Sequence, residues 1–282
     1  MKRWLLLAFL LVLMGYPGSR SPGAESNDRN VILSTTTSTQ DSGLLDLLVP
    51  VFEKQSGYIV KTISVGTGQA LALAARGDAD VVLVHAPTLE QKYVAEGTLL
   101  HRRLVMYNDF VIIGPKDDPA RVRLSKRAVE ALKSIAQAKA IFVSRGDNSG
   151  THNLERSLWK SAGIDPRGAW YLEAGQGMGE TLGIANERSG YTITDRGTYL
   201  ALSKRLSLPI LVEGDRALLN IYSVLEVNPA NGPRINAIGG KAFADFMIAP
   251  QTQSLIRKFG VEKFGQSLFV PVAGKKEADL GA

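Results

Sequence analysis

Strand and helix signals alternate along most of this chain, and that alternation constrains its fold more than any other feature. Short apolar runs that indicate buried strands lie at residues 31–34, 59–65 and 80–84. Segments with helical periodicity follow them at residues 43–55, 70–76 and 88–96. Gly97 is placed to end the third helix. Such a repeat predicts an α/β fold with a parallel sheet between layers of helices.

The pattern restarts after a strand at residues 109–115, which ends at Gly114 and Pro115. Further strands are predicted at residues 140–144, 170–173, 191–194 and 218–227. Further helices are predicted at residues 125–136, 151–162, 179–187, 196–203, 240–247 and 250–259. With 282 residues, 45% of them hydrophobic, the chain can bury two α/β lobes. We interpret residues 107–112 and 219–226 as two strands that cross between the lobes, with the C-terminal helices returning to the first lobe.

The N-terminus has the pattern of a secretory signal. Lys2 and Arg3 precede an apolar run at residues 4–14, which is too short to span a membrane. Ala24 is a plausible last residue before cleavage, so we predict a signal peptide over residues 1–24 and export of the rest. The chain has no cysteine, which excludes a disulfide, a thiol nucleophile and a lipid-modified cysteine.

The charge of the chain says little about partners. Loss of residues 1–24 would lower the formal net charge from +6 to +3, because Lys2, Arg3 and Arg20 would go and no acid would. Basic residues cluster within a segment of helical periodicity that has no interleaved aromatic residues, at Lys116, Arg121, Arg123, Lys126, Arg127 and Lys133. This pattern favours a solvated face over a nucleic-acid groove, and we expect no nucleic-acid partner.

Residues 144–151 form the strongest candidate binding segment. They lie between a predicted strand and a predicted helix, where unpaired N–H groups and the helix dipole favour an anion. Arg145 adds a fixed fork of donors that suits a tetrahedral oxyanion. Ser149, Gly150 and Thr151 add two hydroxyl groups and backbone donors at the helix start.

Two earlier segments have the same position after a strand. Residues 34–39 are six consecutive hydroxyl residues, expected in the loop at the carboxyl end of the first strand. A helix cap needs only one hydroxyl, so we expect a ligand role for at least two of them, with Thr36, Thr37 and Ser38 as candidates. Thr67 lies in a Gly-Thr-Gly turn after the next strand. Residues 175–179 and 194–198 are weaker candidates, since turn chemistry and capping by Asp195 also account for them.

Motifs for catalysis, nucleotides and metals are missing. The sequence has no nucleotide P-loop, no G-x-G-x-x-G after the first strand and no G-x-S-x-G elbow. His85, His101 and His152 stand apart, without the spacing of a metal site. Only His152 beside Thr151 offers a base next to a hydroxyl, and a histidine at a helix start is more often structural. We therefore expect no catalytic residue, no metal and no cofactor.

Seven ordered segments resemble the tungstate-binding proteins (TupA type) of tungstate ABC transporters. They are STTTSTQDSG (34–43), VGTGQ (65–69), MYNDFVIIGP (106–115), FVSRGDNSGTH (142–152), GQGMG (175–179), YTITDRGTY (191–199) and LVEGD (211–215). This resemblance implies the periplasmic binding protein type II fold, with two lobes that close around an oxyanion. It assigns residues 25–109 and 225–282 to lobe 1, and residues 110–224 to lobe 2.

By position, the resemblance places Thr36 and its neighbours on the ligand from lobe 1, and Arg145 with residues 149–151 from lobe 2. It implies capture of tungstate, or of molybdate, in the periplasm and delivery to a membrane permease by a monomer. The spacing of Arg145 and residues 149–151 is also similar to that of phosphate-binding proteins. Phosphate or sulfate capture is therefore the alternative, and an exported hydrolase or anion sensor is a more distant one.

A physical argument favours tungstate over phosphate. Phosphate retains a proton near neutral pH and needs a buried acceptor, whereas tungstate and molybdate need donors only. Phosphate binders have Ser-Asp before an Ala-Pro pair, where this chain has His85 before Ala86 and Pro87. Asp147 and Asp195 remain as other possible acceptors. The expected mechanism is capture by fixed donors, with closure driven by a ligand that contacts both lobes.

Overall fold

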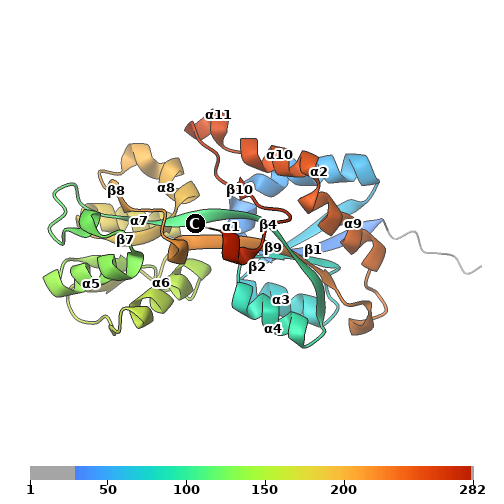
Figure 1. Ribbon diagram of the computed structural model, residues 1–282, viewed down its shortest axis with the longest axis horizontal. Coiled ribbons are helices and arrows are strands. Elements are labelled where there is room, and N and C mark those ends of the chain that lie inside the picture. Colours follow the sequence, from blue (N-terminus) through green and yellow to red (C-terminus); the bar gives the residue numbers. More distant parts are fainter. Residues whose placement is uncertain (1–28, 281–282) are drawn as a thin grey trace, which may run out of the picture.

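The computed structural model describes residues 29–280, so the predicted signal peptide lies outside the described residues. Two groups of helices and strands lie side by side, joined by the long strands β4 (Leu99–Ile113) and β9 (Leu219–Val227) (Figure 1). This is the predicted two-lobe α/β fold. No helix within residues 29–280 has the length and apolar character required to cross a membrane.

Lobe 1 contains the predicted parallel sheet. The strands β1 (Asn30–Thr36), β2 (Ile59–Val65) and β3 (Val81–Val84) are parallel, with β1 in the centre. The helices α1 (Thr37–Asp41), α2 (Leu44–Ser56), α3 (Thr67–Ala75) and α4 (Pro87–Ala95) alternate with them. Gly97 has a φ of 73° just after α4, a backbone conformation that glycine adopts without strain, and so it ends this helix as predicted.

The strands β4 and β9 connect the lobes. They pair antiparallel from Leu99 opposite Val227 to Asp109 opposite Leu219, while β3 pairs with the far edge of β9. The last residues of β4 then pair with lobe 2 strands. The prediction that this strand begins at residue 109 is therefore wrong by ten residues.

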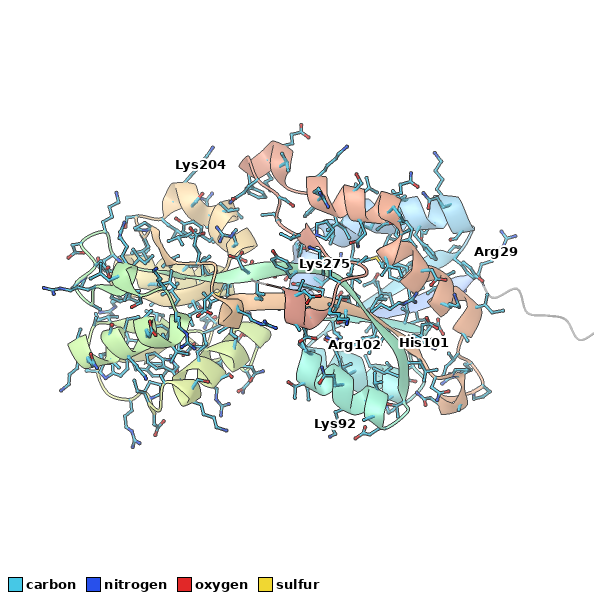
Figure 2. All side chains as sticks on the ribbon, in the orientation of Figure 1. Arg29, Lys92, His101, Arg102, Lys204 and Lys275 are labelled. Carbon is cyan, nitrogen blue, oxygen red and sulfur yellow. The ribbon has the colours of Figure 1, made fainter. Side chains whose placement is uncertain are left out.

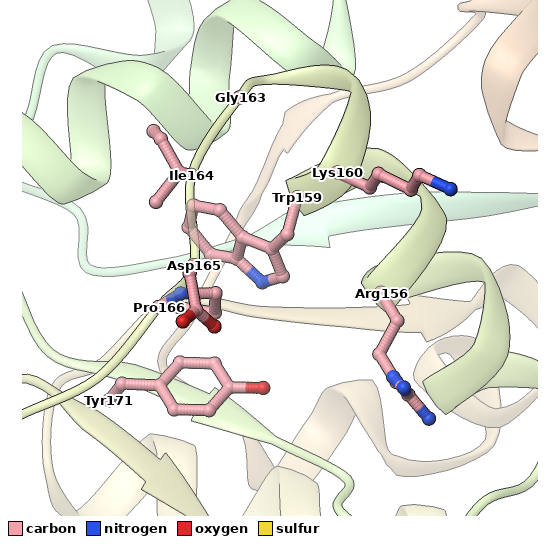
Figure 3. A pocket seen from close by; sticks show the side chains of 8 residues that line it. All are labelled: Arg156, Trp159, Lys160, Gly163, Ile164, Asp165, Pro166 and Tyr171. Atoms are coloured by element: carbon pink, nitrogen blue, oxygen red, sulfur yellow. The ribbon is translucent and has the colours of Figure 1, made fainter.

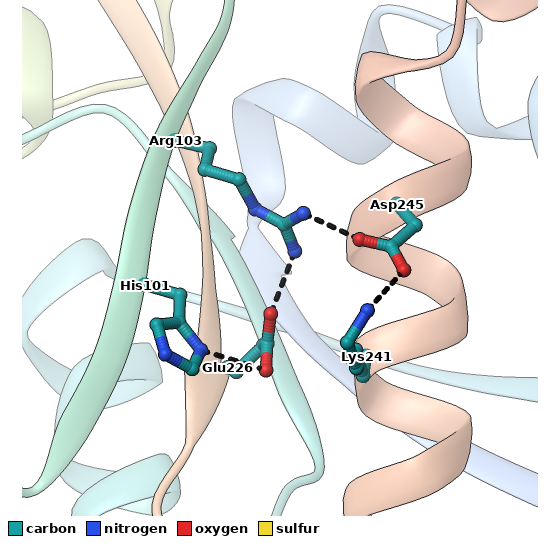
Figure 4. A network of polar contacts seen from close by, with 5 residues as sticks. All are labelled: His101, Arg103, Glu226, Lys241 and Asp245. Atoms are coloured by element: carbon teal, nitrogen blue, oxygen red, sulfur yellow. Dashed lines mark hydrogen bonds and ion pairs between the residues drawn. The ribbon is translucent and has the colours of Figure 1, made fainter.

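The first part of β4, residues 99–106, is not predicted as a strand from the sequence. It carries charged side chains that form ion pairs. Arg103 Nη2 lies 2.7 Å from Glu226 Oε1 on β9, and its Nη1 lies 2.5 Å from Asp245 Oδ1. Lys241 and His101 complete this network (Figure 4). These charged side chains interrupt the apolar pattern that marks a buried strand in the sequence.

Lobe 2 has its own short strands and helices. Its strands are β5 (Phe142–Ser144), β6 (Tyr171–Glu173), β7 (Thr192–Asp195) and β8 (Ile210–Val212). Its helices are α5 (Ala128–Ala138), α6 (Gly150–Ser161), α7 (Met178–Glu187) and α8 (Arg196–Leu202). Phe142, Trp159 and Tyr191 are buried at its centre, in one cluster with Ile112 of β4. The sequence predicts these elements to within a few residues, except β8.

The chain finally returns to lobe 1, as predicted. The helices α9 (Ala237–Ile248), α10 (Pro250–Lys258) and α11 (Val261–Phe264) precede the short strand β10 (Val270–Pro271), which pairs with β4 (Figure 1). Phe243 and Phe246 of α9 pack around Phe52 of α2 in the lobe 1 core. Single 3-10 turns lie at η1 (Val122–Leu124), η2 (Ser203–Arg205), η3 (Arg216–Leu218), η4 (Pro229–Asn231) and η5 (Glu277–Asp279).

Basic side chains are spread over both lobes. Lys92 and Arg29 are exposed on lobe 1 and Lys204 is exposed on lobe 2 (Figure 2). The basic cluster noted in the sequence is exposed at every position, namely Lys116, Arg121, Arg123, Lys126, Arg127 and Lys133. These side chains are therefore open to solvent.

Candidate functional site

The hydroxyl run of lobe 1 does not form a loop, which corrects the sequence prediction. Residues 34–36 continue β1, and Thr37 begins α1 directly. The strand extends because β1 is central and its ladder with β2 runs on to Thr36 opposite Val65. Ser34 Oγ donates to the Ala70 carbonyl at 3.0 Å and Thr35 Oγ1 donates to the Leu83 carbonyl at 2.7 Å. These two hydroxyl groups hold neighbouring elements together.

Thr36 caps α1 from a buried position. Its Oγ1 accepts the Thr39 N–H at 3.2 Å and lies 2.6 Å from Thr39 Oγ1. Thr37 and Ser38, at the start of the helix, are exposed. Within the run, only Thr37 and Ser38 are therefore exposed, whereas Thr39 is buried against Thr36.

Thr67 lies at the start of α3, three residues earlier than the predicted helix start. Gly66 occupies the capping position and makes no side-chain bond to the first turn. Backbone N–H groups in this turn thus lack a side-chain acceptor. Thr67 is half-buried and follows β2 at the same edge of the sheet as Thr36.

The start of α6 in lobe 2 is built by a set of local hydrogen bonds. Ser149 is the N-cap and its Oγ accepts the His152 N–H at 3.3 Å. His152 Nδ1 accepts the Asn148 N–H at 2.9 Å, so this nitrogen is already used in holding the loop. Thr151 is buried and Gly150 is exposed. His152 has the structural role expected of a histidine at a helix start.

Arg145 forms an ion pair within its own loop. Its Nε lies 2.8 Å from Asp147 Oδ2, in a geometry that is an ion pair but not a hydrogen bond. Partial burial of Asp147 opposes its ionisation, but hydrogen bonds from Ser149 and the charge of Arg145 hold the pKa of this carboxyl below its usual value. The one formal cation of the loop is thus balanced by an anion of the same loop.

Glu155 of α6 holds the start of the Arg145 loop, a role that no sequence pattern predicts. Its carboxylate accepts hydrogen bonds from Ser144 Oγ at 2.8 Å, Trp159 Nε1 at 3.1 Å and Tyr171 Oη at 2.8 Å. Burial raises the pKa of Glu155. Because Ser144 directly precedes Arg145, the buried carboxylate fixes the point from which the loop starts.

The two lobes meet at His85, just after β3. His85 Nε2 lies 3.2 Å from Thr36 Oγ1 and 3.3 Å from Ser38 Oγ, all within lobe 1. A methyl group placed on Gly150 of lobe 2 would lie 3.2 Å from His85 Cε1. The hydroxyl residues of lobe 1 and the start of α6 are therefore brought together at this contact. In the sequence, only a short resemblance to phosphate binders points to His85.

The loop at residues 194–198 serves capping and ion pairing. Asp195 caps α8, and its carboxylate accepts from Thr198 N at 2.8 Å and Thr198 Oγ1 at 2.7 Å. Arg196 pairs with Asp109 of β4 and with Glu213. In the other weak candidate, at residues 175–179, Gly177 precedes α7 and Met178 is buried.

A surface hollow lies elsewhere in lobe 2. It has a volume of about 390 Å³ and lies beside the C-terminal half of α6, the end opposite Ser149 (Figure 3). Its lining residues are Arg156, Trp159, Lys160, Gly163, Ile164, Asp165, Pro166 and Tyr171. It contains none of the predicted site residues, and no strand ends there in a glycine-rich turn, so the lobe contact remains the better candidate. Residues 29–280 hold no group of three or more His, Asp or Glu side chains placed for a metal ion.

Comparison with known proteins places the chain in a family. Residues 23–251 match the model of the PBP superfamily domain. The tungstate-binding protein TupA of Peptoclostridium acidaminophilum is 47% identical over 276 residues, which cover 96% of each chain. The structure of the tungstate-binding protein TupA from Desulfovibrio alaskensis G20 matches with a TM-score of 0.80 and 45% identity, covering 86% of this chain and 99% of that one.

A second solved structure, described as the tungstate ABC transporter from Geobacter sulfurreducens, is 51% identical with a TM-score of 0.71. It covers 82% of this chain and 98% of that one. Both the sequence and the fold are thus matched over almost the whole described chain. The chain belongs to the PBP superfamily and, within it, to the family of TupA tungstate-binding proteins.

Proposed function

We propose that this protein captures tungstate, or molybdate as the anion of the same charge and shape, and delivers it to the permease of an ABC transporter. It acts as a monomer in the periplasm, binds without turnover and uses no cofactor or resident metal. Two relatives are named as tungstate-binding proteins and a third as a putative ABC transporter anion-binding protein, which supports a role in binding over one in catalysis.

The observation that carries this proposal is the contact of His85 with both binding segments. It brings Thr36, Ser38 and the start of α6 within reach of one small ligand. Backbone N–H groups and the dipole of this 12-residue helix favour a tetrahedral dianion there. The remaining proposed donors are Thr37, Thr67, Ser149, Gly150 and Thr151.

Arg145 supplies the formal positive charge in this proposal. Its ion pair with Asp147 uses Nε, which leaves the two Nη groups for the ligand. An anion that contacts lobe 1 hydroxyl groups and Arg145 together binds the closed arrangement more tightly than the open one. Binding energy therefore drives closure, and the permease recognises the closed form.

A thermal-shift titration tests the proposal directly. Purified protein is titrated with sodium tungstate, molybdate, sulfate and phosphate, since ligand at about 100 times its dissociation constant stabilises by roughly 2.7 kcal/mol. We expect a large shift with tungstate at near-equimolar ligand and none with phosphate. A shift with phosphate alone would refute the proposal.

A further inference from the structure

The imidazole ring of His85 is contacted by residues of β1, α1 and β9. One face lies against Tyr222 of β9, with the ring centroids 4.8 Å apart. Nε2 faces the hydroxyl groups of Thr36 and Ser38, at 3.2 and 3.3 Å. Asn220, also on β9, donates from Nδ2 to Tyr222 Oη at 3.1 Å and so supports the ring that packs against His85. The ring is thus fixed between lobe 1, the crossing strand and the start of α6.

The contacts with Thr36 and Ser38 engage Nε2 of the imidazole. A neutral imidazole has one N–H donor and one acceptor nitrogen. Burial lowers the pKa of His85 to about 4, so the ring is neutral near pH 7. Because Nε2 already faces two hydroxyl groups, the imidazole offers the O–H group of a ligand no free acceptor on that side.

We infer that His85 determines specificity in this site, by rejecting oxyanions that retain a proton. This inference rests on the proposed function, because it concerns the same site. Hydrogenphosphate with its O–H directed at His85 would leave that donor unpaired, and a buried unpaired donor weakens binding about 10- to 100-fold. Tungstate and molybdate have no such proton at neutral pH. A carboxylate in place of His85 would accept the O–H and repel a dianion.

The first experiment needs no variant. Isothermal titration calorimetry at pH 7.5 compares inorganic phosphate with monofluorophosphate, in which fluorine replaces the hydroxyl group of hydrogenphosphate while the shape and charge are kept. We expect monofluorophosphate to bind at least about 10-fold more tightly, because it brings no unpaired O–H. Equal affinity for the two anions would overturn the inference.

The second experiment exchanges the side chain. We expect His85→Asp to weaken tungstate binding at least about 100-fold relative to phosphate binding, since like charges in contact cost several factors of ten. The matched control His85→Leu is uncharged and has no acceptor, and its tungstate-to-phosphate ratio should stay within about 10-fold of the original. Circular dichroism and thermal unfolding establish that both variants are folded.

An unchanged affinity ratio in folded His85→Asp would contradict the assignment, and so would a shift of the same size in His85→Leu. Failure of the unmodified protein to bind tungstate would instead overturn the proposed function. The two failures are therefore separate results of the same titrations.

Discussion

Replacing Arg145 by alanine is the sharpest test of the proposed site. Arg145 is the one cation of its loop, and its Nη groups are left for the ligand by the ion pair through Nε. A hydrogen bond to a charged group contributes about 1.5–3 kcal/mol, so losing two of them removes about 3–6 kcal/mol of binding free energy. Tungstate affinity should fall by a factor of about 100 or more.

Asp147 makes this test sharper. In Arg145→Ala its carboxylate loses its partner and stands unbalanced beside the proposed anion site. The double variant Arg145→Ala with Asp147→Asn should therefore bind tungstate more tightly than Arg145→Ala alone. The single variant Asp147→Asn should keep or exceed the original affinity.

Calorimetric titration with tungstate measures all four proteins, and thermal unfolding serves as the control. A partly exposed ion pair contributes only about 0–1 kcal/mol to stability, so the melting temperature should change little. An affinity of Arg145→Ala within about three-fold of the original would refute the reasoning. A double variant no better than the single one would show that Asp147 does not act on the ligand.

Three further predictions concern the lobe contact and its supports. The pKa of His85 is about 4 in the folded protein and 6.5 when unperturbed, so the unfolded chain takes up this proton first as pH falls. The free energy of unfolding should therefore decrease by at most about 3 kcal/mol between pH 6.5 and pH 4. Denaturant titrations should show this loss in the original protein but not in His85→Asn. Gly150→Ala should weaken tungstate binding about 10-fold in a calorimetric titration, because its methyl group would lie 3.2 Å from His85. In the control Gly183→Ala the methyl group would have no neighbouring atom within 4 Å, so binding should be unchanged. Glu155→Ala should destabilise the fold by about 2–4 kcal/mol, because two buried donors and the half-buried Tyr171 hydroxyl lose their acceptor. Exposed Glu187→Ala should change stability by less than about 0.5 kcal/mol in chemical denaturation, and equal effects of the two glutamate changes would contradict the anchoring role.

Local patterns in the sequence predict most of the fold. Buried strands such as β3 and amphipathic helices such as α2 are recognised because their patterns are a property of adjacent residues. The pattern fails where long-range partners decide the structure. Residues 34–36 read as a loop but join the sheet beside β2 and β3, and the first half of β4 is disguised by charges that pair with β9 and α9.

The candidate site was predicted in part for the same reason. Strand-to-helix junctions identify Thr36, Thr67 and the start of α6 as places for an anion. The approach of His85 to Gly150 joins residues from two lobes, and no local spacing predicts it. The support of Ser144 by Glu155 was likewise missed, since an acid inside a helical pattern reads as a solvent-facing residue.

The order of the chain through the two lobes has a consequence for how the protein is made. The lobe 1 core joins Leu33 and Phe52 to Tyr222, Phe243 and Phe269, so this lobe cannot complete its core until the last part of the chain has been synthesised. Lobe 2 is contiguous between the crossing strands. During synthesis, the first-made third of the chain must therefore remain incompletely folded with apolar strands exposed, while the middle third can already collapse. Protection from aggregation by a chaperone is most needed in that interval.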